Sequence, residues 1–571
     1  MRLGELLQFF VIGRDHNMYL EIFDTIQRAL SAAAGIPNPI LTDGGTHADF
    51  ATAVAFERAK QLHRSPVQIA EEIAASLRED RSIQGIRIET KGPYINFHTG
   101  AGFLKSSVES ALQPGYGTLP MKEGRVVLEH TSANPNGPLH VGHIRNTILG
   151  DTLSRLFRKA GHRVEVQYYV NDMGRQIAIV AWGFLHLDGA RKDGEKGDHH
   201  VARVYIAGNR ELEKDPGIVA EIDLLMQQVE RGDPTTAVLF RNAVTECLEG
   251  FKVTLGRLSV RHDRFVWESD FVRNGDTERL LNRVRRMEEC HEDGRLWLDL
   301  SKEGFEKEYI LRRSDGTSVY AARDLAYHIW KGRNFDHMID VLGADHKLIG
   351  AQLKATLKLM GEKAPEIVHF EFVSLPEGSM STRAGKFVSA DELIDEVSRR
   401  AYEEVTSRRD DLDEGAKQEI ARSVAIAAIR YDIVKISPEK STVFNWKEAL
   451  DFERQSGPYI QYAHARACSI LSKAGEFDPE FEFTMESEIA LAKHIAKFPY
   501  VIRIAVRDLK PHLVATYARE LADLFNVFYQ FEPVLKSTGI TRQSRLTLVK
   551  ATKNTLAETL GTLGIDALVT M

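Results

Sequence analysis

The chain has 571 residues, more than one hydrophobic core normally supports, so about three or four domains are expected. Hydrophobic residues make up 43% and charged residues 27%, and no apolar run approaches the roughly 18 residues of a membrane span, which excludes a membrane-spanning protein. The formal net charge of −7 excludes a general polycation, so a phosphate-binding surface would need its basic groups gathered in one place. The three cysteines form no CxxC pair, which argues against a structural zinc site and a disulfide framework and fits a reducing cytoplasm.

Residues 1–105 are predicted to form an N-terminal α+β domain. The start of the chain has an apolar patch but no basic leader, which favours a helix over a signal peptide. Pro66, preceded by Ser65 as a candidate N-cap, is predicted to open a helix. Alternating apolar and polar residues on both sides of Gly92 and Pro93 predict a hairpin.

Residues 120–400 show a strand–helix–strand pattern. A short buried strand at 126–128 precedes a helical apolar repeat that Gly161 is predicted to close, and a second strand follows at 163–170. Such a unit indicates a Rossmann-like parallel sheet, which binds ligands at the carboxyl ends of its strands. Between about 185 and 300 the sequence turns polar and helical, which indicates an insertion in this fold.

The remainder of the chain is predicted to be helical. Connecting helices are expected over 401–440 and an all-α domain over 441–571. In the segment 512–531 an apolar stripe recurs at helical spacing, and its interpretation as core packing is preferred to a ligand site. The stripe consists of Leu513, Tyr517, Leu521, Leu524, Phe525 and Phe528.

The strongest local signal is EHTSANPNGPLHVGHIRN, which starts at Glu129. A Pro/Asn/Gly loop follows the first strand, and His140, Gly142 and His143 open the next helix, whose N-terminus offers N–H groups and a favourable dipole for phosphate. Two histidines three residues apart could donate hydrogen bonds to phosphate oxygens as charge develops. The glycine would allow a nucleotide to approach closely. Taken alone, the pair could also bind a metal or be plain surface.

The segment HVGH resembles the HIGH signature of class I aminoacyl-tRNA synthetases, and the longer string SANPNGPLHVGHIRN resembles the arginyl-tRNA synthetases in particular. Downstream, GSMSTRAGKFVS at 378–389 resembles the KMSKS loop in its archaeal-type MSTRxGKFV form. Ser379 and Thr382 stand where that loop carries lysines, and Gly137 stands where some arginyl enzymes carry a substitute lysine. The resemblance therefore implies a catalytic loop containing Met380, Ser381, Arg383 and Lys386, with the last two as candidates to neutralise the leaving pyrophosphate.

A guanidinium is a flat cationic fork that suits paired carboxylates. In the resembled family, a Glu five residues before an Asn, together with a Y-x-x-x-D pair, lines the arginine pocket; both spacings are present here. The residues so implied are Glu129, Asn134, Tyr320, Asp324 and, less directly, Gln352. Without the resemblance, each acid would be interpreted as solvated or salt-bridged.

Two further segments match the family near its nucleotide. VLGADHKLIGAQ implies ATP contacts by Gly343, Asp345 and His346. QYYVNDMGRQI places Asn171, Asp172 and Gln176 near the substrate, although a turn with a helix cap is an equally simple interpretation.

The resemblance also implies contacts with RNA. Aromatic and amide side chains suit unstacked anticodon bases, although the same residues could simply pack between helices. The implied tRNA-binding residues are Asn96 in the N-terminal hairpin, Tyr459, Gln461, Tyr462, Arg466 and the last residue, Met571. Basic residues in the last domain suggest a phosphate-facing surface, although such runs are usually just solvated. They include Lys493, Lys497, Arg503, Arg507 and a stretch from Lys536 to Lys553 that contains Arg545.

The resemblance spans nearly the whole chain and implies a class I enzyme in which a Rossmann-like catalytic domain lies between an N-terminal α+β domain that contacts the tRNA elbow and an all-α anticodon-binding domain. The implied substrates are L-arginine, ATP with its Mg²⁺, and tRNA(Arg), with no metal held by the protein, no membrane partner, and a cytoplasmic monomer. Three alternatives differ in function: a tRNA-binding module that does not charge tRNA, a small-substrate adenylyltransferase, and a class I synthetase for another amino acid. The absent KMSKS lysines motivate the first of these, and the two-carboxylate pocket opposes the last.

Overall fold

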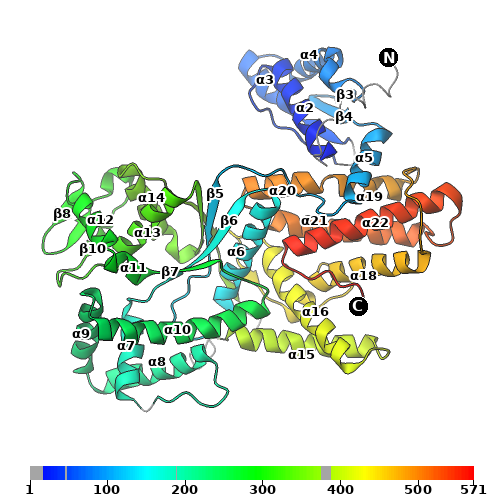
Figure 1. The fold of residues 1–571 in the computed structure, drawn as a ribbon. Helices are drawn as coiled ribbons and strands as arrows, with labels where there is room; N and C mark the ends of the chain where they lie inside the picture. The colour runs from blue at the N-terminus through cyan, green and yellow to red at the C-terminus, as the bar shows by residue number, and fades with distance from the viewer. Residues whose placement is uncertain (1–16, 46–47, 188, 375–387) are drawn as a thin grey trace.

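The computed structural model describes residues 17–45, 48–187, 189–374 and 388–571. The helix predicted at the start of the chain lies outside these residues, apart from its end. Figure 1 shows three parts: a small N-terminal domain, a central α/β region that the sequence analysis expects to be catalytic, and a bundle of helices that leads to the C-terminus. None of the described helices is long and apolar enough to cross a membrane.

The N-terminal domain packs four helices against an antiparallel sheet with the strand order β1-β2-β4-β3. The predicted hairpin is confirmed, since β3 and β4 pair from Arg87–His98 to Lys91–Tyr94 around Gly92, which has a positive φ of 60°. Pro66 is the first residue of its helix and Ser65 the N-cap, although the serine side chain makes no capping bond. The elements are α2 (Met18–Ala34), β1 (Thr42–Asp43), β2 (Phe50–Thr52), α3 (Val54–Leu62), α4 (Pro66–Glu79), β3 (Arg87–Lys91), β4 (Tyr94–His98) and α5 (Ala101–Ala111).

The catalytic region is built on a five-stranded sheet with the order β12-β11-β5-β6-β7, in which every neighbouring pair is parallel. The predicted strand–helix–strand unit is confirmed as β5, α6 and β6, and Gly161 follows the end of α6 with a positive φ of 83°. Val126, Val127 and Leu128 of β5 are fully buried in the middle of the sheet, so Glu129 is carried to its carboxyl edge. The elements are β5 (Arg125–Glu129), α6 (Val141–Lys159), β6 (Arg163–Val170), β7 (Arg264–Trp267), α13 (Tyr320–Asn334), β11 (His337–Gly343), α14 (Lys347–Leu359) and β12 (Glu366–Phe370).

The segment predicted as a polar helical insertion differs in two respects from that expectation, because it contains strand β7 and also the antiparallel pair β8 and β9. Helices α7 to α10 are present, but β7 pairs with β6 and forms an edge of the central sheet. Four residues between polar flanks are too few to show a strand period, so only the pairing identifies β7. The elements are α7 (Arg175–His186), α8 (Gly197–Lys214), α9 (Ile218–Glu230), α10 (Pro234–Arg257), α11 (Glu268–Arg273), α12 (Asp276–Val284) and the antiparallel strands β8 (Cys290–Glu292), β9 (Leu296–Leu298) and β10 (Tyr309–Arg312).

The C-terminal part is helical, as predicted. In α21 the predicted stripe is core, because Tyr517, Leu521, Phe525 and Phe528 are buried. The elements are β13 (Val373–Ser374), α15 (Ala390–Arg408), α16 (Glu414–Val434), β14 (Thr442–Val443), α17 (Trp446–Ala449), α18 (Gly457–Ala474), α19 (Glu486–Ala496), α20 (Phe498–Arg507), α21 (His512–Phe531) and α22 (Gly539–Thr562).

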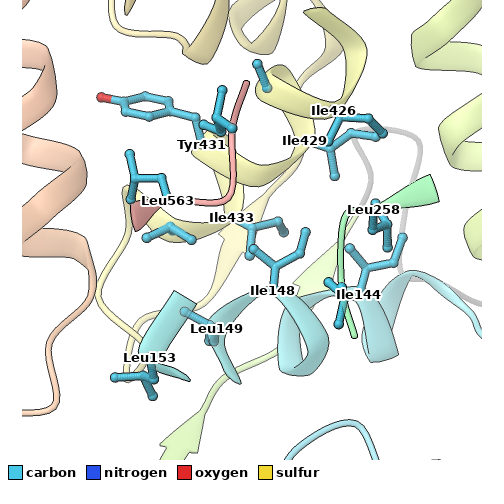
Figure 2. Close-up of a cluster of buried hydrophobic side chains, with 14 of the residues drawn as sticks. Ile144, Ile148, Leu149, Leu153, Leu258, Ile426, Ile429, Tyr431, Ile433 and Leu563 are labelled. Atoms are coloured by element: carbon cyan, nitrogen blue, oxygen red, sulfur yellow. The ribbon is translucent and has the colours of Figure 1, made fainter. Parts of the chain in front are cut away.

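A shared core joins the catalytic sheet to these helices. Figure 2 shows Ile144, Ile148 and Leu149 of α6 facing Ile429 and Ile433 of α16. These side chains are almost completely excluded from water, and each buried aliphatic side chain contributes about 1.5–3 kcal/mol of hydrophobic free energy. The start of α6, which carries HVGH, is therefore held between the sheet and the helical part.

Arg145 fastens the same region from within. Its side chain is fully buried, and its guanidinium donates to five main-chain carbonyls, two of them from Glu371 and Phe372 and three from Ser437, Pro438 and Lys440. Strand β13 pairs with β14 beside it. The segment that leads into the second signature is thus tied to the linker that leads into the last domain.

Candidate active site and tRNA-binding surface

The two signature histidines cap the N-terminus of α6. Nδ1 of His140 accepts a hydrogen bond from the main-chain N–H of Gly142 at 3.1 Å, and Nδ1 of His143 accepts from that of His140 at 3.3 Å. The two rings stack with centroids 3.6 Å apart. Because Nδ1 accepts in both rings, each neutral ring carries its proton on Nε2. Burial lowers the pKa of His140 and lowers that of His143 to about 3, so both rings are neutral donors at neutral pH.

The second signature is described only at its exit. Met380, Ser381, Arg383 and Lys386 lie outside the described residues. After them, the N–H of Val141 donates to the carbonyl of Val388 at 3.2 Å, and the N–H of Ala390 donates to that of Leu139 at 2.7 Å. The end of the second signature is therefore hydrogen-bonded to the start of the helix that carries the first.

Asp391, in the first turn of α15, lies among cations from two helices of the preceding region. Lys196, before α8, pairs with Asp391, and Arg257 of α10 approaches it at 3.2 Å. Thr254 donates a further hydrogen bond to it at 3.1 Å. The start of α15 is thereby attached to α8 and α10, which Figure 1 shows beside it.

Glu129 and Asp324 are joined by a chain of buried polar contacts. Nζ of Lys331 donates to Glu129 at 2.8 Å and to Asp340 at 2.7 Å. The ring of His328 contacts Asp340 through Nε2 at 2.8 Å and Asp324 through Nδ1 at 3.2 Å. All five residues are at most 8% exposed. The structure therefore brings the two predicted arginine-pocket carboxylates into one network, at the carboxyl edge of β5 and on α13.

Tyr320 lies one turn before Asp324 on the same helix and is 36% exposed, so it can face a ligand. Asn134 is exposed in the loop before HVGH. Gln352 is buried on α14, where its Nε2 donates to the carbonyl of Lys307 at 2.9 Å. The amide of Gln352 is thus already used to hold a neighbouring loop.

The network contains residues that the sequence analysis missed. His328 and Lys331 follow Asp324 by four and seven residues, which is the spacing of one helix face, and this repeat could have identified them. Asp340 is the register partner of Glu129 on the adjacent strand, a relation that only the sheet order reveals. Beside this network, Arg323 pairs with Glu268 and Glu230, and burial raises the pKa of Glu268 to about 7.

Some buried polar atoms near the network have no hydrogen-bond partner among the described residues. They include the hydroxyls of Tyr169 and Tyr309 and Oδ1 of Asn171. Burial raises the pKa of both tyrosines; the charges of Glu268 and Asp324 raise that of Tyr169 further, and the charge of Asp324 raises that of Tyr309. Buried groups without partners carry a desolvation cost, so these atoms suit a ligand that would bond to them.

The candidate nucleotide residues lie at the carboxyl end of β11. Asp345 and His346 are exposed in the turn after Gly343, and a Cβ at Gly343 would lie 2.4 Å from Oδ1 of Asp345, so a larger residue there would displace this side chain. Asp172 accepts hydrogen bonds from the N–H and hydroxyl of Ser269, at 2.8 and 2.6 Å. Asp172 therefore holds the start of α11 and does not cap α7, whose N-cap is Gly174 without a side-chain bond.

Among the described residues, two groups of histidine and carboxylates have the spacing of a metal site. One is Glu129, His328 and Asp340; the other is Asp198, His199 and Asp391. In each group a lysine ammonium, from Lys331 or Lys196, lies between the carboxylates. The protein's own cation therefore neutralises each group.

Four of the predicted RNA-binding residues line one cavity of about 620 Å³ in the last domain: Tyr459, Tyr462, Arg466 and Met571. The guanidinium of Arg466 stacks on Tyr462 and Tyr529, at 4.8 and 5.2 Å. Gln461 is fully buried, and its Nε2 donates to the carbonyl of Asp566 at 2.8 Å. In the N-terminal domain Asn96 is 8% exposed on β4. The cavity thus unites four of the six, and Gln461 and Asn96 are buried elsewhere.

Several basic residues that suggested a phosphate-facing surface have other partners. Lys493, Lys497 and Arg503 pair with Asp49, Asp43 and Asp24 of the N-terminal domain. Arg545 is buried between Glu488 and Glu532. The interpretation of these four as phosphate ligands is wrong, because helical spacing does not show which acids a distant segment brings.

Comparison with known proteins agrees with this architecture. The family described as "tRNA synthetases class I (R), catalytic domain" matches residues 109–446, "DALR anticodon binding domain" matches 460–571, and "Arginyl tRNA synthetase N terminal domain" matches 21–99. The sheet that carries HVGH is thus a class I tRNA synthetase catalytic domain.

Individual relatives extend the match over nearly the whole chain. The arginine–tRNA ligase of Methanoregula boonei is 64% identical over 97% of this chain and 100% of its own, and that of Methanosphaerula palustris is 63% identical with the same coverage. The solved arginyl-tRNA synthetase of Thermus thermophilus is 31% identical, with a TM-score of 0.85 over 96% of this chain and 100% of that one. The chain belongs to the arginyl-tRNA synthetase family.

Proposed function

We propose that this chain, as an arginine–tRNA ligase, activates L-arginine with ATP to arginyl-adenylate and transfers the arginyl group to the 3′ end of tRNA(Arg). In the first step the arginine carboxylate attacks the α-phosphorus, the bond to the bridging oxygen breaks, and pyrophosphate leaves. In the second step a hydroxyl of the terminal ribose attacks the adenylate carbonyl, loses its proton, and AMP leaves. Neither step requires a covalent bond to the protein, so catalysis rests on positioning and electrostatics.

One observation carries the assignment of the amino-acid pocket: the buried network that joins Glu129 and Asp324. We assign these carboxylates to the guanidinium of arginine, with Tyr320 and Asn134 on the open side of the pocket. An uncharged competitor would leave the carboxylates unpaired, and this costs more than a missing methylene does. Gln352 supports the pocket wall through the carbonyl of Lys307.

We assign the nucleotide to the space between the start of α6 and the turn after β11. His140 and His143 donate from Nε2 to the phosphates, and Gly142 leaves room for them. Gly343, Asp345 and His346 line the nucleoside side. Mg²⁺ enters with ATP as part of the substrate, and Arg383 and Lys386 of the second signature neutralise the leaving pyrophosphate.

For tRNA we assign the anticodon to the cavity of Tyr462, Arg466, Tyr459 and Met571, where stacked aromatic and guanidinium planes suit unpaired bases. Gln461 acts on this cavity indirectly, because it holds the carbonyl of Asp566 in the segment that ends at Met571. The hairpin with Asn96 faces the tRNA elbow. We place the enzyme in the cytoplasm as a monomer.

The first test is arginine-dependent ATP–pyrophosphate exchange on the purified chain, with and without a tRNA(Arg) transcript. Exchange that depends on arginine is expected, and exchange only with tRNA would show that activation needs the bound tRNA. No exchange under either condition, while the transcript still binds, would overturn the proposal in favour of a tRNA-binding module. Exchange with a different amino acid would instead support another class I specificity.

A further inference from the structure

Four side chains form what we call the pocket floor: Glu129, His328, Lys331 and Asp340. Their contacts run without interruption from Glu129 through Lys331 and Asp340 to His328, which then contacts Asp324. Glu129 and Asp340 lie side by side on neighbouring parallel strands, with the ammonium of Lys331 between them. The family pattern identified Glu129 but not the other three residues of the floor. These three are buried: Lys331 is 0% exposed, and His328 and Asp340 are 2% exposed.

The charges of the floor cancel by themselves, but those of the floor and Asp324 together do not. Glu129, Asp324 and Asp340 supply three negative charges, and Lys331 and protonated His328 supply two positive ones. Arg323 is matched separately by Glu230 and Glu268, and this trio is close to neutral when Glu268 holds a proton. The floor and Asp324 together therefore retain one uncompensated negative charge at the bottom of the pocket. A bound guanidinium supplies the missing positive charge.

We propose that Lys331, His328 and Asp340 are positioning and specificity-determining residues for arginine: they hold Glu129 and Asp324 in a fixed orientation and leave the empty pocket short of one positive charge. This inference rests on the proposed roles of Glu129 and Asp324. The substrate class that the charge balance selects is an amino acid whose side chain is a permanent monocation.

The directions of the pKa shifts agree with this count. Burial opposes the charge of His328, but Asp324 and Asp340 outweigh it and raise the pKa of His328 to about 10. Burial also opposes the charge of Lys331, and Asp340 and Glu129 outweigh it to raise its pKa. Burial is the main cause that raises the pKa of Glu129; the charges of Lys331 and His328 lower it, and those of Asp340 and Asp324 raise it. A cationic ligand in contact with Glu129 would add to the effect of Lys331 and His328 and favour the ionised carboxylate.

A purely structural role explains this arrangement less well. A buried ion pair commonly stabilises a fold no more than well-packed apolar residues of the same volume would. Five buried ionisable groups in series, with one charge in excess, would be a poor way to fasten α13 to the sheet. They are a good way to keep two carboxylates charged and oriented where water has been excluded.

The test uses the full-length chain and compares arginine with L-citrulline, in which a neutral ureido group replaces the guanidinium. The KM for arginine, the inhibition constant of citrulline and the KM for ATP are measured in the exchange assay for D340N, K331M and the double variant K331M/D340N. By the charge count, D340N brings the pocket to neutrality, K331M increases its negative charge, and the double variant restores the original imbalance. The matched control is R545M, which breaks a buried ion cluster in the last domain, far from the floor.

We expect D340N to raise the arginine KM by about tenfold or more, as loss of a group that orients a ligand-binding side chain usually does, while citrulline inhibition stays within about twofold of wild type. In K331M a proton held between Glu129 and Asp340 must leave before arginine binds, so its kcat/KM for arginine should rise with pH. The double variant should lose this pH dependence and bind arginine better than K331M. R545M should lower the melting temperature without changing the arginine KM.

The inference is overturned if D340N weakens arginine and citrulline equally, or if the double variant is no better than K331M and keeps its pH profile. Should K331M not fold, the arginine-to-citrulline ratio of D340N decides by itself. E129Q and D324N are measured in parallel. If these two leave the arginine KM unchanged, the proposed pocket fails; if they raise it while D340N does not, the pocket stands and the inference about the floor fails.

Discussion

His143 and His328 belong to the same catalytic region and serve the same proposed reaction, but their surroundings hold them in opposite charge states. His143 stacks on another histidine at a helix N-terminus, with no carboxylate in contact among the residues that the structure describes, and its pKa is lowered to about 3 by burial and by the neighbouring ring. His328 lies between two carboxylates, which raise its pKa to about 10 against the effect of burial. Burial alone therefore does not decide the protonation of a histidine; the groups that share the burial do.

This difference corresponds to the two ligands. Neutral histidines at a helix N-terminus can donate hydrogen bonds to a polyanion, whereas a protonated histidine behind two carboxylates helps to keep both ionised for a cation. The two ends of the site should consequently respond to mutation in separable ways, with arginine binding affected at one end and phosphate chemistry at the other.

The largest effect is expected at the end of the site that is proposed to bind arginine. D324N or E129Q should raise the arginine KM by about a hundredfold or more, because removing one member of a buried charge pair leaves the other unmatched. The KM for ATP should change little, and D293N, on the exposed turn between β8 and β9, is the matched control. An equal rise in both KM values would erase the proposed separation between the two ends.

At the end of the site that is proposed to bind phosphate, the rate of exchange should change and the arginine KM should not. H143N should slow exchange by about a hundredfold, the usual effect of losing one hydrogen-bond donor to a developing charge, with the arginine KM unchanged. H186N, on the exposed part of α7, is the control for losing a histidine as such. If H143N raised the arginine KM without slowing exchange, His143 would belong to the arginine-binding end and not to the phosphate-binding end.

The two histidines should also make the free energy of unfolding depend on pH in opposite directions. Because the pKa of His143 is lower in the folded chain than its usual 6.5, unfolding takes up a proton, and stability falls as pH falls from 6.5; this costs about 2 kcal/mol by pH 5. Because the pKa of His328 is raised, its contribution is complete below pH 6.5 and is lost as pH rises toward 10. Urea unfolding across this range should show that H143N removes part of the acid loss and H328Q part of the alkaline loss. The same pH dependence in both variants and the wild type would contradict the assignment.

The smallest effect is expected where charges are only partly buried. The pairs of Lys493 with Asp49 and of Arg503 with Asp24 join the last domain to the N-terminal domain, and one member of each is more than 40% exposed. K493M or R503M should lower the unfolding free energy by only about 1 kcal/mol or less, and added salt should shrink the difference from wild type. K91M, on the exposed β3–β4 hairpin, is the control. A loss of stability as large as that of R545M, which breaks a buried ion cluster, would mean that burial does not set the size of the effect.

Much of this molecule could be predicted from particular patterns. The β5–α6–β6 unit, the hairpin at Gly92 and the buried stripe of α21 all follow from apolar period and turn residues, which act locally. Glu129 and Asp324 were proposed for the pocket through a family pattern, because nothing local distinguishes them from solvated acids.

What could not be predicted depends on pairings between distant segments. Strand β7 is too short to show a period, and Asp340 meets Glu129 only because β11 lies next to β5. Gln461 has the composition of a base-reading residue, but its helix face is covered by the segment that ends at Met571. Lys493 and Arg503 suggested a phosphate surface until the N-terminal domain supplied their acids.

Arg145 has a consequence for how freely the sequence around it can vary. Its guanidinium binds five main-chain oxygens and no side chain of residues 371, 372, 437, 438 or 440. Those five positions can accept many substitutions without losing the bonds, because every residue type offers the same carbonyl. Position 145 cannot, since lysine has only three donors and would leave at least two of the carbonyls without this partner. In protein design, the side chains at these five positions between the catalytic region and the anticodon-binding domain can therefore be varied widely, provided that Arg145 is kept.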